Sequence, residues 1–197
     1  METISNALFW ISNGLMVPVV VVLLLFLVQA ALLACGFFGT FLRRSSRQKR
    51  LKALLDGEPS DISWQLASFT NSTKELFPRA IAALLAHKGD SAYRERILAQ
   101  YEIDASKELG GPRILAKVGP MLGLMGTLIP MGPALVGLAS GDLASMAYNM
   151  QVAFATTVIG MLVAGVGVVT LQVKQRWLSG EMNDLEYINS VIDNEKE

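Results

Sequence analysis

Charged residues are missing from three long parts of this 197-residue chain. No Asp, Glu, Lys or Arg occurs between Leu15 and Leu42, between Lys117 and Asp142, or between Asp142 and Lys174. A helix needs about 20 apolar residues to cross the hydrocarbon core of a bilayer, and each stretch is long enough. The 52% hydrophobic content is therefore concentrated in three blocks. We expect an all-α, polytopic membrane protein with three transmembrane helices and a helical cytoplasmic region.

Residues that bind metals or perform catalysis are also scarce. The single cysteine, Cys35, lies inside the first uncharged stretch and has no second cysteine to pair with. The single histidine, His87, lacks companion ligands, and its place near an expected helix C-terminus suits the helix dipole. The chain has no phosphate loop, nucleophile elbow or dinucleotide fingerprint. We expect no enzyme activity, no metal site and no cofactor.

Basic residues are absent from one side of the expected membrane path. All 17 Lys and Arg lie in 43–117 or in 174–196. The positive-inside rule places both stretches in the cytoplasm, which gives an N-outside, C-inside path. A cleavable signal peptide is the alternative for the first span, but its basic residues should precede a shorter apolar region, whereas RRSSRQKR follows this one. That basic run is better explained as a topology signal than as a nucleic-acid site, because it abuts the membrane and lacks interleaved aromatics.

This topology predicts a multi-pass protein of the inner (cytoplasmic) membrane with seven segments. They are an extracytoplasmic N-terminus (1–14), transmembrane helix 1 (15–42), a cytoplasmic helical loop (43–112), transmembrane helix 2 (113–139), a short extracytoplasmic loop (140–147), transmembrane helix 3 (148–173) and a cytoplasmic C-terminal helix (174–197).

Capping residues predict three short helices in the cytoplasmic loop. Asp61 caps the first, Pro78 opens the second, which ends at Gly89, and Asp90 or Ser91 caps the third. The third helix has an apolar stripe of Ile97, Leu98, Tyr101, Ala105 and Leu109. A second stripe, Leu178, Met182, Leu185, Ile188 and Ile192, follows the third span. This second stripe either packs within the subunit or forms a helical collar shared between subunits.

Small residues recur at helical spacing in the second and third spans. Gly119, Gly123 and Thr127 follow one another at intervals of four residues, which forms a narrow face that another helix can approach closely. The packing residues expected from the two spans are Gly119, Gly123, Gly126, Gly160 and Ala164. The two spans form an antiparallel hairpin in which the small faces are available to meet.

Each small face also carries threonine. A Thr in a membrane helix more often bonds the carbonyl four residues earlier than it serves an ion. Thr127 in the second span and Thr156 and Thr157 in the third lie on consecutive spans, which favours a function for them. A proton path needs a titratable group in the membrane. No Asp, Glu, His, Lys or Arg lies well inside any of the three spans, so this chain can supply hydroxyls that hold water while the carboxylate comes from another polypeptide.

Two motifs carry a resemblance to a known family. PMLGLMGT in the second span and ATTVIGM in the third resemble the MotA/TolQ/ExbB family of proton-channel subunits, whose second span carries P-x-x-G-L-x-G-T. The likeness covers about Ala92 to Trp177, and the three-span order resembles the TolQ and ExbB branch. Pro130 stands near a position where these relatives have glycine, and Gln151 and Val152 stand where TolQ and ExbB proteins carry glutamate.

The resemblance implies a function and partners. It implies a homo-oligomer of five subunits around two copies of a single-span partner similar to ExbD, TolR or MotB, which supplies a membrane aspartate. It places Thr127, Thr157 and the adjacent Thr156 in the ion pathway. The leading hypothesis is therefore a proton-channel subunit of a membrane motor. A non-conducting membrane scaffold, in which the glycine faces serve packing only, is the alternative, and an enzyme comes third.

The orientation is testable by labelling single cysteines in a Cys35→Ala background. Cysteines at Ser5 and Ser140 should react with an impermeant thiol reagent added from outside, whereas a cysteine at Ser60 should not, because the basic stretches stay inside. Labelling of the cysteine at position 60 alone would show that the chain has the opposite orientation in the membrane.

Overall fold

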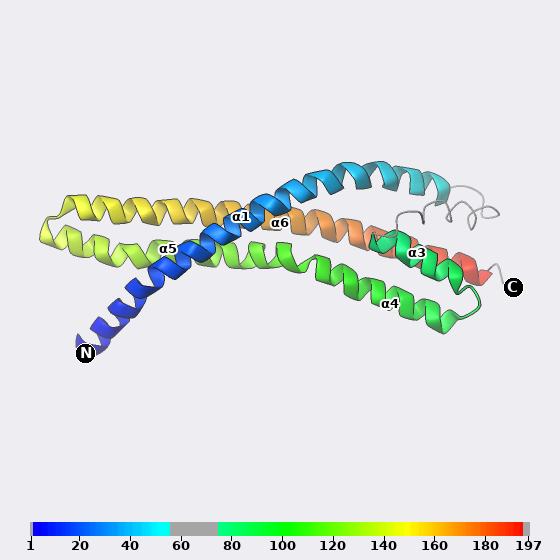
Figure 1. The fold of residues 1–197 in the computed structure, drawn as a ribbon, viewed down its shortest axis with the longest axis horizontal. Helices are drawn as coiled ribbons and strands as arrows, with labels where there is room; N and C mark the ends of the chain where they lie inside the picture. The colour runs from blue at the N-terminus through cyan, green and yellow to red at the C-terminus, as the bar shows by residue number, and fades with distance from the viewer. Residues whose placement is uncertain (1, 56–74, 195–197) are drawn as a thin grey trace. The chain divides into compact units, whose positions relative to one another are not determined.

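A computed structural model describes residues 2–55 and 75–194. Its helices are α1 (Glu2–Leu55), α3 (Leu76–Ala86), α4 (Ser91–Glu108), α5 (Gly110–Ser140) and α6 (Leu143–Asn194) (Figure 1). No strand occurs among these residues, so the expected all-α class is confirmed. The helix expected to follow Asp61 lies outside the described residues.

Three helical stretches are long and apolar enough to cross a membrane, as the sequence predicts. They are Ala7–Thr40, Ser91–Ser140 and Leu143–Asp193. A helix end does not mark a membrane surface, so the seven segment limits stay predictions. The chain divides into two compact units. We call Met1–Phe37 with Gly111–Leu171 the membrane unit, and Phe38–Gly110 with Gln172–Glu197 the polar unit.

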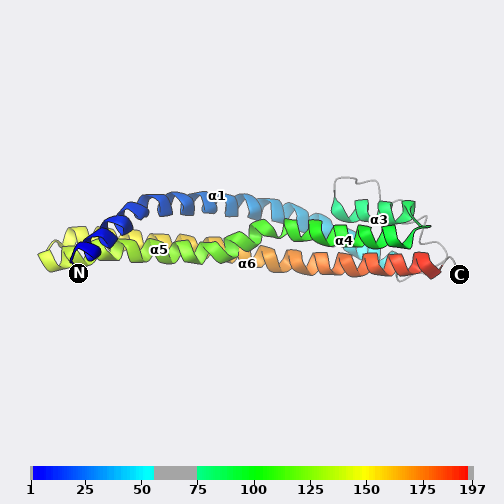
Figure 2. The same ribbon diagram turned by 90° about the horizontal axis from the view of Figure 1, so that it is seen from below.

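In the membrane unit, α5 and α6 form an antiparallel hairpin (Figures 1 and 2). Only Gly141 and Asp142 separate the two helices, so residues 143–147, expected in a loop, are helical. Gly141 has a φ of 76°, a left-handed conformation that favours glycine. Asp142 caps α6, because its carboxylate accepts a hydrogen bond from the Ser145 backbone nitrogen at 3.0 Å. The local chemistry of these two residues therefore fixes a tight turn.

The hairpin is held at a very short separation by glycines on both helices. A Cβ atom added at Gly160 would lie 2.7 Å from the Gly123 Cα, and one added at Gly167 would lie 2.5 Å from the Ala116 nitrogen. Near the turn, a Cβ at Gly137 would lie 3.2 Å from the Met146 nitrogen. The two backbones therefore touch along most of the hairpin, at positions where any side chain would separate them.

Helix α1 packs on this hairpin in the membrane unit. Ala30 of α1, Leu115 of α5 and Val163 of α6 are fully buried in one cluster. Phe26, Leu27 and Leu33 of α1 are partly buried against it. Much of the remaining surface of α1 is exposed in the single chain. This agrees with its β-branched and leucine-rich composition, which suits an outer helix in contact with lipid.

In the polar unit, the capping signals of the sequence are close to the observed helix ends. The Asp90 carboxylate accepts a hydrogen bond from the Tyr93 backbone nitrogen at 3.1 Å and caps α4. Helix α3 begins at Leu76, so Pro78 lies inside its first turn rather than opening it. Only Leu109 separates α4 from α5, which begins at Gly110.

The apolar stripes of α4 and α6 are buried within the polar unit. Tyr101 and Ala105 of α4 and Leu109, which caps its C-terminus, are buried, and the expected members Ile97 and Leu98 are half-buried. On α6, four of the five expected residues are buried and Met182 is half-buried: the buried ones are Leu178, Leu185, Ile188 and Ile192. Burial in a single chain favours packing within the subunit over a collar between subunits.

Two buried polar contacts join α4 to α6 in the polar unit, and neither was expected from the sequence. The Arg94 side chain is 0% exposed; its Nε donates to the Asn189 Oδ1 at 2.7 Å, and it also donates to the Lys88 carbonyl and pairs with Asp193. Further along α4, the Tyr101 hydroxyl donates to Glu181 at 2.6 Å. Arg94 is stable in the interior because all three of its donor nitrogens are satisfied.

The close backbone contact is testable at two glycines of α6. Gly160→Val should lower the free energy of unfolding by about 1–3 kcal/mol, because its side chain meets the backbone of α5. Gly165→Val is the matched control, since no atom lies within 4 Å of a Cβ at that position. Thermal unfolding of the purified protein in mild detergent measures both. Equal midpoints for the two variants would contradict the close packing.

Candidate ion-pathway site

The α5–α6 hairpin brings the predicted packing residues to one contact. A Cβ at Gly119 would lie 3.1 Å from both the Ala164 nitrogen and the Gly160 carbonyl oxygen. One at Gly123 would lie 3.3 Å from the Gly160 Cα, and Gly126 meets α6 at a third point. All five residues therefore lie at the contact between the two helices of one chain.

Thr156 fills the space left by a glycine of the facing helix. A Cβ at Gly126 would lie 2.6 Å from both the Cβ and the Oγ1 of Thr156. The Thr156 side chain is 4% exposed, and its hydroxyl donates to the Val152 and Ala153 carbonyls of its own helix at 3.1 and 2.9 Å. In the single chain, Thr156 therefore sits at a packed position.

Thr127 and Thr157 are more accessible than Thr156. Both are half-buried. The Thr127 hydroxyl donates to the Leu124 carbonyl at 2.7 Å, and the Thr157 hydroxyl donates to the Ala153 carbonyl at 3.1 Å. A hydroxyl that donates one hydrogen bond still has lone pairs to accept others. Each of these two hydroxyls therefore keeps the ability to accept a hydrogen bond from water.

The two accessible threonines belong to neighbouring parts of the contact. A Cβ at Gly123 would lie 3.7 Å from the Thr157 Cα. Thr127 follows Gly123 by four residues, which puts it on the same side of α5 about one turn further along. The hairpin thus presents a hydroxyl from each helix within about a helical turn of one another.

The membrane unit has no charged side chain on the part of the hairpin that carries Thr127 and Thr157. Asp142 is the only charged residue between Lys117 and Lys174, and it lies in the turn, where it is exposed and caps α6. Gln151, which stands where TolQ and ExbB proteins carry glutamate, is exposed on α6. Pro130 is fully buried, and α5 continues as a helix through it. Among the described residues, no three His, Cys, Asp or Glu side chains are grouped to hold a metal ion.

Large apolar side chains cover the outer surfaces of the hairpin. Exposed examples are Leu124, Leu128 and Leu135 on α5 and Phe154, Val158 and Met161 on α6. An apolar surface of this extent is unsuited to water, which agrees with three helices apolar enough to cross a membrane.

A model of the MotA/TolQ/ExbB proton channel family matches residues 72–187. The matched region includes α3, α4, α5 and most of α6, and it contains every candidate pathway residue. No individual curated protein matched the chain.

The fit of Thr156 against Gly126 is testable with a double-mutant cycle. Gly126→Ala should destabilise the hairpin by about 1–3 kcal/mol, because the new methyl group overlaps the Thr156 side chain. Combining it with Thr156→Gly should cost less than the sum of the two single changes, since the second change removes the atoms in the way. Thermal unfolding of the four proteins in detergent gives the coupling. Strict additivity would show that the two side-chain positions do not meet.

Proposed function

The chain belongs to the MotA/TolQ/ExbB proton channel family, and from this membership we propose that several copies form a ring around a single-span partner and convert proton flow into mechanical work. The family assignment and the three apolar helices make the chain a proton-channel subunit of a multi-pass membrane complex. The proposal extends this to the ring, the partner's role and the motor activity.

The pair of accessible hydroxyls on the α5–α6 hairpin is the observation that carries the proposal. Thr127 and Thr157 are half-buried and close to a common glycine, Gly123, and no Asp, Glu, His, Lys or Arg lies well inside their spans. Proton transfer across a bilayer needs a group that gains and loses a proton. In our proposal the partner provides this group as a membrane aspartate, and the two threonines hold water beside it.

The exposed apolar surfaces of the membrane unit support assembly. In the single chain, long side chains such as Leu128 on α5 and Val158 on α6 are exposed on the hairpin that also carries the pathway threonines. We propose five copies enclosing two partner helices, in the three-span arrangement typical of the TolQ and ExbB branch. The N-terminus lies outside the inner membrane and the polar unit lies in the cytoplasm, as the distribution of Lys and Arg predicts.

The membrane potential provides enough energy for such a machine. One charge that crosses a membrane potential gains about 2.3 kcal/mol per 100 mV. A proton that binds the partner aspartate from one side and leaves to the other changes the charge of the partner helix inside the ring. The ring then holds the neutral and the charged helix differently, and this difference drives movement of the partner.

A non-conducting scaffold is the second candidate, and one observation favours it. All three threonine hydroxyls donate to carbonyls of their own helices, as threonines without a functional role also do in membrane helices. In that case the glycine contact serves packing only. The Thr156 position, packed against Gly126, fits this role better than Thr127 or Thr157.

Removing the hydroxyls separates the two functions. The double variant Thr127→Val, Thr157→Val keeps the side-chain shape and removes both oxygens, so it should abolish proton flow while the complex still assembles. Thr→Ser at the same positions should retain much of the flow. The measurement is proton uptake into proteoliposomes that contain this protein and its partner, under an imposed potential and normalised to assembled complex.

Thr170→Val is the matched control, since Thr170 is buried on α6 outside the two motifs. It should leave the flow unchanged. Normal flow through the double variant would support the scaffold. A scaffold role predicts only a small effect of the substitutions, because hydrogen bonds between membrane helices are typically worth about 0.6 kcal/mol. A loss of proton flow that only follows a loss of assembled complex would therefore also support the scaffold.

A further inference from the structure

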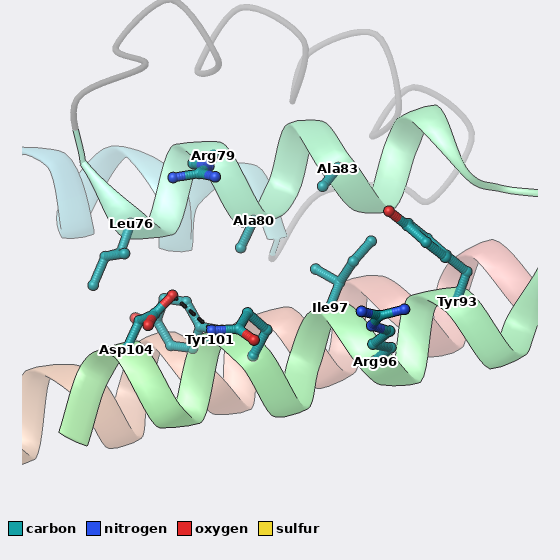
Figure 3. A pocket seen from close by; sticks show the side chains of 10 residues that line it. Leu76, Arg79, Ala80, Ala83, Tyr93, Arg96, Ile97, Tyr101 and Asp104 are labelled. Carbon is teal, nitrogen blue, oxygen red and sulfur yellow. Dashed lines mark hydrogen bonds between the residues drawn. The ribbon is translucent and has the colours of Figure 1, made fainter. Parts of the chain in front are cut away.

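The polar unit carries a positively charged face around a cavity of about 330 Å³ between α3 and α4 (Figure 3). Arg79 of α3 and Arg96 of α4 line this cavity, and both are exposed. The helices also supply apolar side chains to it, and Figure 3 shows Ile97 between them. We call the surface formed by Arg79, Arg96 and the cavity the basic face.

One acidic residue, Asp104, also lines the cavity, but its charge is already compensated. Lys107 donates a hydrogen bond to one carboxylate oxygen at 2.8 Å and Gln100 donates to the other at 3.1 Å. These hydrogen bonds, first that of Lys107, hold the pKa of Asp104 below its usual value. Arg79 and Arg96 make no hydrogen bond or ion pair with any residue that the structure describes. The charge of Arg79 also acts on Asp104, but with Lys107 bound to that carboxylate the basic face keeps a net positive charge.

A groove of about 690 Å³ between α4 and α6 carries the opposite charge. Glu102 of α4 and Glu186 of α6 line it; both are exposed, and neither has a hydrogen-bond or ion-pair partner within 75–194. Its apolar lining consists mainly of Tyr101, Leu109, Leu178 and Met182. We call the surface formed by Glu102, Glu186 and the groove the acidic face.

The two faces cannot meet within one chain. Arg96 and Glu102 are six residues apart on α4, which separates them by about 120° around the helix axis. A contact between the two faces needs a second copy, and it joins different surfaces of the two copies. Such head-to-tail contacts repeat from copy to copy and close into a ring when the rotation allows.

An apolar side chain on the side of the basic face gives this contact a further anchor. Ile103 is 53% exposed and follows Arg96 by seven residues, so both lie on the same side of α4. The acidic face offers an apolar groove that can bury such a side chain, with charged residues at its edge. Interfaces commonly combine a buried apolar centre with a charged rim of this kind.

We propose that the basic face of one copy docks on the acidic face of the next, so that Arg79 and Arg96 approach Glu102 and Glu186 of its neighbour. This inference rests on the proposed ring and names the surfaces that join its polar units. Rim charges act mainly on orientation and specificity. Two basic faces, or two acidic faces, repel each other, so the charges select the head-to-tail order over a two-fold pair.

Cysteine cross-linking in membranes tests the contact with the full-length chain. Two differently tagged copies are co-expressed in the Cys35→Ala background, one with Gln100→Cys on the basic face and one with Asn183→Cys on the acidic face. These neutral positions line the two faces and leave the four rim charges in place. Oxidation should join the two tags. Glu108→Cys replaces Gln100→Cys in the matched control and should give no product, since it is exposed on α4 but lines neither face.

Charge reversal in the same system tests the complementarity. Glu102→Lys with Glu186→Lys in the acidic-face copy should lower the cross-linking yield about tenfold, because like charges then meet. Arg79→Glu with Arg96→Glu in the other copy should restore the yield, which a folding defect would not do. Glu108→Lys should have no effect. High salt should weaken the unaltered contact, because ions screen exposed charges.

The outcomes separate this contact from the ring itself. If native mass spectrometry shows an oligomer but the two tags do not join, or if reversal leaves the yield unchanged, the docking of these faces is wrong and the ring stands. If the chain is monomeric in mild detergent and forms no cross-linked oligomer in membranes, the ring fails and the docking fails with it. Joining of the acidic-face cysteine to a different protein would also overturn the inference.

Discussion

The contact between the α5 and α6 backbones is the constraint on which the membrane unit depends. Glycines on both helices meet there, and Cβ atoms at Gly160 or Gly167 would lie within 3 Å of backbone atoms. Lipid tails are as apolar as leucine, so burial of apolar side chains does little to join helices in a membrane. Close van der Waals contact over a long surface does so instead, and it needs small residues on both sides. The same contact positions Thr127 and Thr157 relative to each other.

The polar unit is stabilised by different interactions from those of the membrane unit. Its helices bury apolar stripes, as in a water-soluble bundle, and they add a fully buried arginine and a buried tyrosine–glutamate hydrogen bond. A buried charge is destabilising unless its donors are satisfied, and Arg94 satisfies its donors with groups from α6 and from the turn before α4. These contacts define the relative position of α4 and α6 and hence the groove between them.

Sequence patterns predicted the features that depend on local spacing. The absence of charge predicted the three apolar helices, and the capping pattern narrowed the start of α4 to Asp90 or Ser91, of which Asp90 is the cap. The glycines at four-residue spacing lie at the contact between α5 and α6. The patterns did not predict contacts between distant residues. Arginine is rarely buried in proteins. Asn189 and Asp193 lie 95 and 99 residues from Arg94 in the sequence, so no local pattern indicated that these three side chains meet. The fit of Thr156 into the space at Gly126 depends on the register of two helices, which spacing alone does not determine.

The two-residue turn limits what the chain can carry at this end of the hairpin. Gly141 and Asp142 are the whole connection between α5 and α6, so this chain has no folded domain between these two helices. A part that reaches outward from this turn therefore cannot be an insertion between α5 and α6. At this end the hairpin presents only Gly141, Asp142 and the adjoining helix ends for contact with other molecules.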